Sequence, residues 1–206
     1  MPADLSSLVA PWRTAVVTAG VQKGIVGDGS AVPTPGRAAS AAMLARLLHL
    51  VDAARAAGAE VVHGTYVQRA DGKGSNHNAR LFAGPGGSPT ALVAGSVAAQ
   101  LAGEVGAAST DVVVTRSQGL NPMAGTELDA VLRHLGVTTI VAAGASVNVA
   151  VTNLVMDAVN RGYDVVLPRD AVCGAPARYV EDVIDNTLSL LATVTTVDEI
   201  VARWND

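Results

Sequence analysis

The sequence predicts an α/β protein in which a parallel β-sheet is covered by helices on both faces. Three stretches show a helical pattern, then a glycine, then a run of β-branched and apolar residues; the glycines are Gly58, Gly136 and Gly162. A glycine just past a helix end can take the left-handed conformation that closes the last turn. The runs that follow are apolar without strict alternation, which is typical of strands buried on both faces. Strands and helices that alternate in this way form βαβ units, whose right-handed crossovers place helices on both sides of the sheet.

Three further runs belong to the expected sheet. TAVVTA at residues 14–19 and DVVVT at residues 111–115 are short, apolar and β-branched, as buried strands are. ATVTTV at residues 192–197 is a candidate for a sixth strand. The ligand of an open parallel sheet binds at the carboxyl ends of its strands, so the segments after these runs are where function is expected.

Helix starts are marked by capping residues. Thr34 and Ser88 are each followed by a proline, which favours the first position of a helix, and both pairs therefore predict helix starts. Thr126 opens a helix that is expected to end at Leu135. Apolar residues at helical spacing predict the buried face of the first long helix: Met43, Leu47, Leu50 and Ala54.

Composition limits the class of protein. A chain of 206 residues predicts one domain over residues 1–206, and 50% hydrophobic with 16% charged residues excludes an intrinsically disordered chain. The net charge of −4 and the absence of a basic run make nucleic-acid binding an unfavoured interpretation. Polar residues interrupt the longest uncharged stretch, between His134 and Asp157, so no transmembrane helix and no membrane partner are expected.

Cellular location is predicted from two weaker features. The first residues lack a basic segment and reach Asp4 at once, so we expect no secretory signal. Cys173 is the one cysteine of the chain and cannot form an internal disulfide, which fits a reducing cytoplasm. Its expected role is that of a small apolar core residue rather than a nucleophile.

The loop at residues 69–88 is too long for a plain connection and predicts a functional or mobile segment. His77 lies in this loop and is the one histidine placed to face a ligand, whereas His63 lies inside an apolar strand, where we expect a buried and satisfied side chain. Asp28 follows the first strand and is a second candidate acid or base. Both have plainer interpretations, because Asp28-Gly29 is a turn pair and the segment around His77 could simply be solvated.

The stretches ELDAVLRHLG, IVAAGASVNVAV and MDAVNRGYDVV, with TAVVTAGVQKGIVG near the start, resemble the isochorismatase-like hydrolase superfamily, also called the cysteine hydrolases. The resemblance covers about residues 14–201. It implies a three-layer α/β/α sandwich around a six-stranded parallel sheet, which is a Rossmann-like fold. It also implies a small-molecule substrate and, in many members, a homodimer or larger homo-oligomer.

The chain departs from this family at the residues that carry its chemistry. Most members use an Asp, a Lys and a Cys, and the corresponding positions here hold Gly20, Arg116 and Ala150. Ala150 offers no nucleophile, Gly20 accepts no proton, and an arginine stays protonated at neutral pH. The branch that hydrolyses vinyl ethers uses the same Asp as a general acid and is excluded for the same reason. The D-x-H-x-x-H zinc cluster of the nicotinamidases is missing as well, so we expect no metal and no cofactor.

Parts of the family's substrate site could persist without the triad. The resemblance implies a cis peptide before Ser146 and an oxyanion hole formed by the backbone amides of Ser146 and Ala150, which need no particular side chain. The substrate-binding positions that it implies are Gly20, Gln22, Ser146, Asn148 and Ala150. Arg116 would add planar donors suited to a carboxylate.

Two classes of function follow. The first is a divergent hydrolase that acts on a small carbonyl- or carboxylate-bearing compound by a non-cysteine mechanism, with Arg116, His77 and Asp28 as its catalytic candidates. The second is a catalytically silent pseudoenzyme that binds a small ligand or a protein partner. Turnover that is lost on replacement of His77 or Asp28 would distinguish the first from the second.

Overall fold

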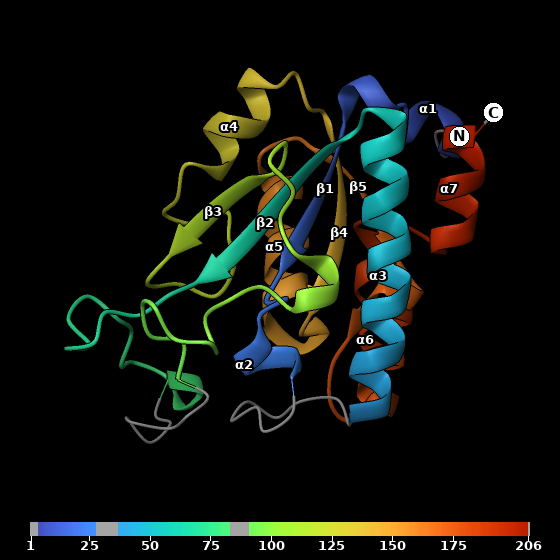
Figure 1. The fold of residues 1–206 in the computed structure, drawn as a ribbon. Helices are drawn as coiled ribbons and strands as arrows, with labels where there is room; N and C mark the ends of the chain where they lie inside the picture. Colours follow the sequence, from blue (N-terminus) through green and yellow to red (C-terminus); the bar gives the residue numbers. More distant parts are fainter. Residues whose placement is uncertain (1–3, 28–36, 83–90, 206) are drawn as a thin grey trace.

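The structure is a computed structural model that describes residues 4–27, 37–82 and 91–205. Its centre is a parallel sheet with the strand order β3-β2-β1-β4-β5-β7, and a seventh, short strand, β6, pairs with β4 (Figure 1). The strands are β1 Thr14–Ala19, β2 Glu60–Tyr66, β3 Val112–Arg116, β4 Thr139–Ala145, β5 Asp164–Pro168, β6 Val172–Cys173 and β7 Thr193–Thr195. The six runs predicted from the sequence are therefore confirmed as strands, and β6 is an addition.

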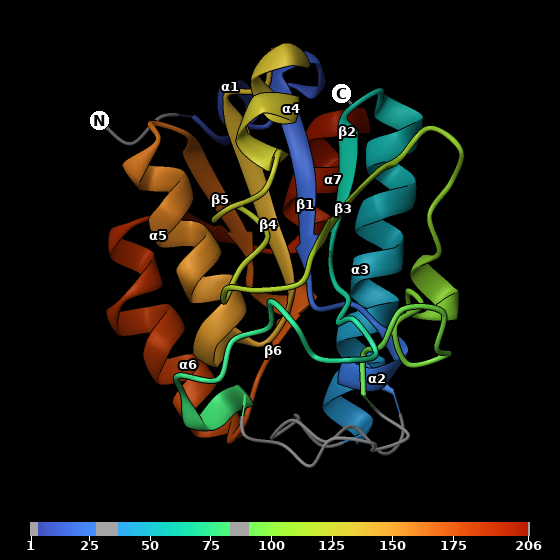
Figure 2. The ribbon, with the colours of Figure 1, turned by 90° about the vertical axis from the view of Figure 1, so that its left-hand side faces the viewer.

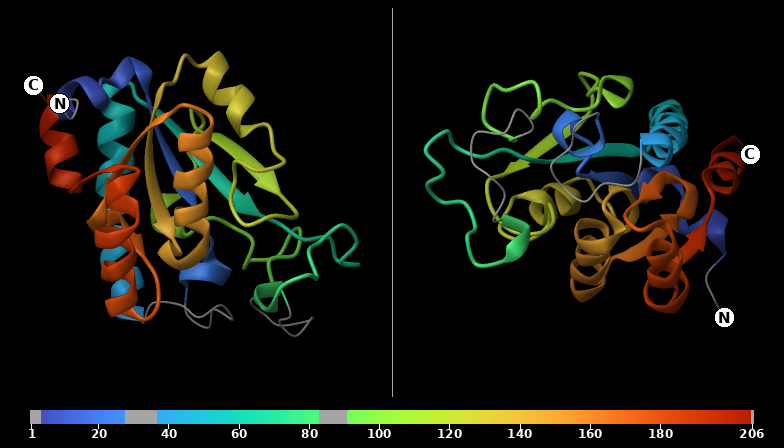
Figure 3. Two further views of the ribbon diagram at one scale, coloured as in Figure 1. Left: turned by 180° about the vertical axis from the view of Figure 1, so that it is seen from behind. Right: turned by 90° about the horizontal axis from the view of Figure 1, so that it is seen from below.

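Helices cover both faces of the sheet and make the predicted three layers (Figure 3). One face packs against α1, α3 and α7, and the other packs against α4, α5 and α6. The α-helices are α1 Leu5–Leu8, α2 Lys23–Val26, α3 Arg37–Ala57, α4 Leu128–His134, α5 Thr152–Asn160, α6 Ala177–Asn186 and α7 Val197–Asn205. Short 3-10 turns are η1 Pro11–Arg13, η2 Arg80–Phe82, η3 Gly103–Val105, η5 Arg169–Ala171 and η6 Leu188–Leu190, and η4 Val147–Val151 is a π-helical turn.

The local signals explain where several elements begin and end. Gly58, Gly136 and Gly162 have φ angles of +79°, +71° and +83°, so each helix closes through the left-handed residue that was predicted. The hydroxyl of Thr126 accepts a hydrogen bond at 3.1 Å from the N–H of Leu128, the first residue of α4. The predicted apolar face of α3 is buried: Met43, Leu47, Leu50 and Ala54 are at most 2% exposed.

The helix predicted after Ser88 is wrong. Ser88 and Thr34 themselves lie outside the described residues, but residues 91–102 form turns and isolated bridges instead of a helix. The carbonyls of this segment are used by α2: the N–H of Lys23 donates to Gln100 and the N–H of Gly24 donates to Ala98. Tertiary hydrogen bonds therefore replace the helical ones that the capping signal predicted.

Candidate functional site

The candidate site lies at the carboxyl edge of the sheet, where four neighbouring strands end. Gly20 directly follows β1, Arg116 is the last residue of β3, and Ser146 directly follows β4. These strands and β2 are adjacent in the order β3-β2-β1-β4. Figure 2 shows η2 and the segment before it at the end of the molecule to which β1 points.

Gly20 fits closely against the turn that follows β4. Its φ angle is +66°, and a methyl group added there would overlap the carbonyl oxygen of Ala145. The peptide bond between Ala145 and Ser146 is cis, as the resemblance implied. The glycine thus has a backbone reason to be present, and no acidic side chain fits at this position with the backbone as it stands.

The turn after β4 presents small, half-buried residues. Ser146 and Ala150 are both partly exposed. Asn148 is anchored: its amide donates to the carbonyl of Ala175 at 2.6 Å and accepts from the N–H of the same residue at 3.0 Å. The Asn148 side chain therefore fixes the turn against the segment that precedes α6.

Arg116 is the principal charged group of the site. Its guanidinium donates weakly to the carbonyls of Gly119 and Leu120, at 3.3 and 3.4 Å, and lies 4.9 Å from the ring centroid of Tyr66. Its Nε has no hydrogen-bond partner, and no carboxylate lies within ion-pair distance of it, among the residues that the structure describes. Burial lowers the pKa of Arg116 to about 10, so the cation persists at neutral pH.

Gln22 has a supporting position behind Arg116. The side chain is fully buried and donates to the carbonyls of Tyr66 and Ala99, at 3.0 and 2.8 Å. It also accepts from the N–H of Tyr66 at 2.8 Å. These hydrogen bonds hold the end of β2, and with it the ring beneath Arg116, so Gln22 acts through its neighbours and has no exposed surface for a ligand.

Asp28 and His77 are the two candidate acids or bases that the sequence predicts to lie in loops. Asp28 lies outside the described residues. His77 is exposed, and its neighbour Asn76 accepts a hydrogen bond from the N–H of Gly119 at 2.6 Å. Because Gly119 also accepts from Arg116, this contact brings the long segment after β2 to the Arg116 loop.

A buried polar chain was not predicted from the sequence. His63 is bonded on one side to the hydroxyl of Thr18 at 3.0 Å and on the other to the carboxylate of Asp111 at 3.2 Å. Asp111 also forms an ion pair with Arg55 at 2.5 Å. This order of groups resembles a catalytic triad, but Thr18 and His63 are 0% exposed, so no substrate reaches them. This buried chain of groups could have been anticipated from the sequence, because Thr18 and His63 lie in neighbouring strands, where they are register partners.

The remaining thiol is also out of reach. Cys173 is 5% exposed, and burial raises its pKa to about 12, which keeps the thiol protonated. It pairs with Ala145 in the β4–β6 ladder and contributes to the core, in agreement with the role expected for it.

The described part of the chain contains neither a cluster of metal ligands nor a membrane-spanning helix. No cluster of three or more His, Cys, Asp or Glu side chains there is arranged to hold an ion. None of the helices in residues 4–27, 37–82 and 91–205 is both long and apolar enough to cross a bilayer.

Comparison with known proteins places this chain in a family. The model of the isochorismatase domain matches residues 14–199, and the chain therefore belongs to the isochorismatase family. The uncharacterized isochorismatase family protein YecD of Escherichia coli O157:H7 is 31% identical over 97 residues. That match covers 47% of this chain and 51% of the relative, so the chain spans about half the length of the curated relative that it matches.

Solved structures share the whole fold. A cysteine hydrolase from Pseudomonas syringae pv. phaseolicola 1448A superposes with a TM-score of 0.85 at 24% identity, covering 96% of this chain and 95% of that one. An isochorismatase family protein from Burkholderia thailandensis gives a TM-score of 0.79 at 26% identity, covering 95% and 97%. N-carbamoylsarcosine amidase from Thermoplasma acidophilum gives 0.71 at 19% identity, covering 90% and 97%. These matches confirm the predicted three-layer fold, and the domain match over residues 14–199 confirms the predicted family.

Proposed function

We propose that this chain binds a small carboxylate- or carbonyl-bearing compound at the carboxyl edge of the sheet, with Arg116 as its anchor. The observation that carries the proposal is the state of Arg116: partly buried, charged, and without a carboxylate partner among the described residues. A buried charge without a partner is costly, and an anionic ligand would compensate it. The free Nε and a neighbouring Nη form the planar edge that binds a carboxylate through two parallel hydrogen bonds.

Ligand binding is the function best supported, because this chain lacks the side chains on which the family's covalent mechanism depends. Ala150 carries no nucleophilic atom and Gly20 carries no acid or base. Cys173 cannot substitute, since it is buried and protonated at neutral pH. A chain with this site would bind its ligand without the cysteine nucleophile that the family resemblance implies.

Hydrolysis by a non-cysteine mechanism is the second candidate. The hydrogen bond between Asn76 and Gly119 favours it, because it brings the segment that carries His77 to the loop beside Arg116. A histidine there could activate a water molecule toward a bound carbonyl group. Asp28 is the other candidate for this role.

Isothermal titration calorimetry tests the proposal with acetate, succinate, benzoate and the neutral amide benzamide. We expect Arg116→Ala to lose at least about tenfold in carboxylate affinity, the scale of one charge-assisted hydrogen-bonded pair. Arg133→Ala is the matched control, because Arg133 also lies over a tyrosine, 5.2 Å from the ring of Tyr163, but on α4. Equal affinities of the wild type and Arg116→Ala would overturn the proposal.

A turnover assay with amides, esters and vinyl ethers separates the two candidates. Release of product that His77→Ala or Asp28→Ala abolishes would establish the hydrolase. Saturable binding with no product from any of the three substrate classes would establish the binding protein.

A further inference from the structure

We infer that Ser75 supplies a second contact to the ligand at Arg116, so that the site selects a carboxylate bearing a further hydrogen-bonding group, such as a hydroxy acid. The inference rests on the proposed function of Arg116. It adds Ser75, in the long segment after β2, as a specificity-determining residue; neither the sequence nor the family resemblance gave Ser75 a role.

Unpaired polar atoms point to Ser75. Three buried side-chain polar atoms in the described part of the chain have no hydrogen-bond partner: Ser75 Oγ, Arg116 Nε and Thr139 Oγ1. Thr139 begins β4, at the edge of the sheet opposite to the site. An unpaired buried polar atom costs about 1–3 kcal/mol, so such atoms are rare unless something else satisfies them. Two of the three belong to segments that are in contact with each other.

The contact between these segments is a short chain of hydrogen bonds. Asn76, the residue after Ser75, accepts from the N–H of Gly119 at 2.6 Å. The carbonyl of the same Gly119 accepts from Arg116 Nη1 at 3.3 Å. Asn76 and Arg116 therefore bond to the same residue, Gly119, and Ser75 directly precedes Asn76 in the sequence.

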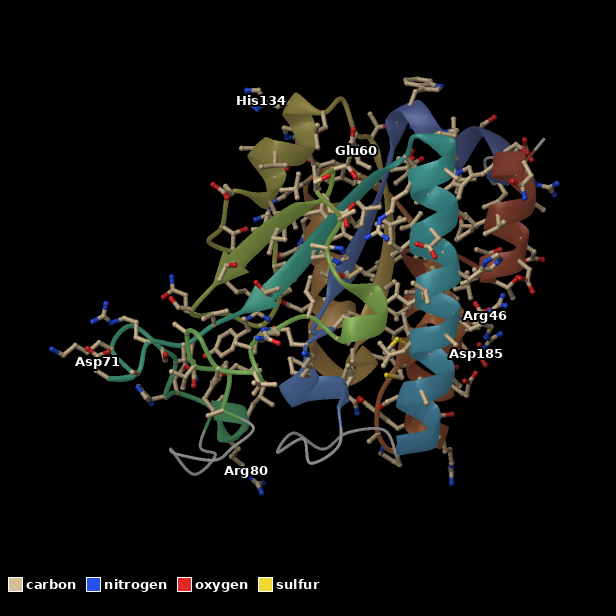
Figure 4. All side chains as sticks on the ribbon, viewed as in Figure 1. Arg46, Glu60, Asp71, Arg80, His134 and Asp185 are labelled. Carbon is tan, nitrogen blue, oxygen red and sulfur yellow. The ribbon has the colours of Figure 1, made fainter. Side chains whose placement is uncertain are left out.

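The backbone before Ser75 is held in place by its own hydrogen bonds. Arg69 donates twice to the carboxylate of Asp71, at 2.9 Å each, and Asp71 accepts from the N–H of Lys73 at 3.1 Å. The N–H of Ser75 donates to the carbonyl of Gly72 at 3.2 Å. Figure 4 shows Asp71 at the end of the molecule opposite to Glu60, the first residue of β2. A segment ordered in this way does not pay a large ordering cost when a ligand binds.

The chemistry of the two groups defines the ligand class. A guanidinium only donates hydrogen bonds, whereas a hydroxyl donates and accepts. Arg116 thus suits the carboxylate, and Ser75 suits a second polar group that carries its own hydrogen or lone pair. Hydroxy acids have both features, and their deoxy counterparts have only the first.

The experiment compares each hydroxy acid with its deoxy counterpart: lactate with propionate, malate with succinate, and salicylate with benzoate. Affinities are measured by titration calorimetry on the wild type, Ser75→Ala, Arg116→Ala and Ser189→Ala. We expect the wild type to prefer the hydroxy acid of at least one pair by about five- to tenfold, as one hydrogen bond allows. Ser75→Ala should abolish that preference and leave the deoxy acid unchanged. Ser189→Ala, at an exposed serine bonded to the carbonyl of Asp185, should behave as the wild type.

Each result supports or overturns a separate statement. Equal binding of all hydroxy and deoxy pairs by the wild type, or an unchanged preference in Ser75→Ala, overturns the inference about Ser75. Unchanged affinities in Arg116→Ala overturn the proposed function itself. Thermal unfolding of the free protein checks the fold of the variant: Ser75→Ala removes an unpaired hydroxyl and should not lower the melting temperature.

Discussion

The guanidinium of Arg116 lies over the ring of Tyr66, with 4.9 Å between Cζ and the ring centroid. The two residues are register partners at the ends of β3 and β2, and Gln22 fixes the backbone of Tyr66 from the other side. A ring face stabilises a cation by about 0.5–2 kcal/mol but accepts no directed hydrogen bond along the plane of the guanidinium. The arrangement therefore holds the cation in place and leaves an N–H group for a ligand.

Replacement of Tyr66 tests whether the ring positions Arg116. We expect Tyr66→Leu to weaken carboxylate binding about three- to tenfold, because the cation loses its supporting face. Tyr66→Phe keeps that face and loses only the hydroxyl, which accepts from Gln68 at 3.0 Å, so its affinity should stay within about twofold of the wild type. Calorimetric titration measures both. A Tyr66→Phe variant as weak as Tyr66→Leu would show that the hydroxyl, and not the ring, is what matters.

Gly20 is predicted to be required by the backbone. A residue with a side chain pays about 1–2 kcal/mol in the left-handed conformation, and at Gly20 it also overlaps the carbonyl oxygen of Ala145. Gly136 is the matched control, because its φ of +71° is close to the +66° of Gly20 and nothing lies within 4 Å of an added methyl group. Chemical denaturation should show a larger loss of unfolding free energy for Gly20→Ala than for Gly136→Ala. Equal losses of unfolding free energy in the two variants would mean that the backbone at Ala145 shifts easily to make room. An acidic residue at position 20 would then be tolerated.

Most of the fold could be predicted because its signals are local. The apolar runs, the glycines after helices and the hydroxyl of Thr126 before α4 each act on neighbouring residues, and the structure places strands and helices accordingly. The two-residue strand β6 was missed because so short a strand has no pattern of its own. The helix after Ser88 was wrongly expected because hydrogen bonds to α2, distant in sequence, decide the conformation of residues 91–102.

The residues of the site could be predicted only where the sequence resembles the motifs of a known family. Strand ends located Gly20 and Arg116, but nothing in the sequence pairs Gln22 with the backbone of Tyr66 or Asn76 with Gly119. Such contacts join segments more than 40 residues apart and arise only in the folded chain. The same holds for Ser75, whose buried hydroxyl has no sequence signature.

The buried pair of His63 and Asp111 predicts a pH-dependent stability. Burial lowers the pKa of His63 in the folded state, an effect that its hydrogen bond to Asp111 opposes only in part. In the unfolded chain His63 takes up a proton near pH 6.5, whereas in the folded chain it stays neutral at this pH. The full contribution of His63 to the unfolding free energy is therefore present above pH 6.5. Below it, the unfolding free energy should fall by up to about 1.4 kcal/mol per pH unit. The pKa of Asp111 is also lowered, and its contribution is lost only in more acidic solution.

Urea denaturation from pH 7.5 to 5.0 measures this dependence. His63→Gln should be less stable than the wild type at pH 7.5, and its stability should vary less between pH 6.5 and 5.0. His134→Gln, at an exposed histidine, is the control and should retain the wild-type slope. A wild-type slope in His63→Gln would assign the pH dependence to other groups.

Cys173 is predicted to be unreactive in the folded protein. Its thiol is 5% exposed and its pKa is raised to about 12, so little thiolate is available at pH 8. A thiol-specific chromogenic reagent should react slowly with the native chain and fully, with one thiol per chain, after denaturation. Ligand affinity should survive treatment with the reagent. Rapid native labelling, or loss of binding that parallels the labelling, would contradict the burial of this residue.

The most direct test of the account follows the Nε–H resonance of Arg116 by ¹H–¹⁵N NMR. The resonance is identified by its disappearance in Arg116→Lys and is then followed as a bound carboxylate is titrated in. Because this N–H has no acceptor among the described residues, we expect a large downfield proton shift that saturates with the calorimetric affinity. An Arg116 Nε–H resonance that stays unchanged while the carboxylate binds would contradict the assignment of the site to Arg116.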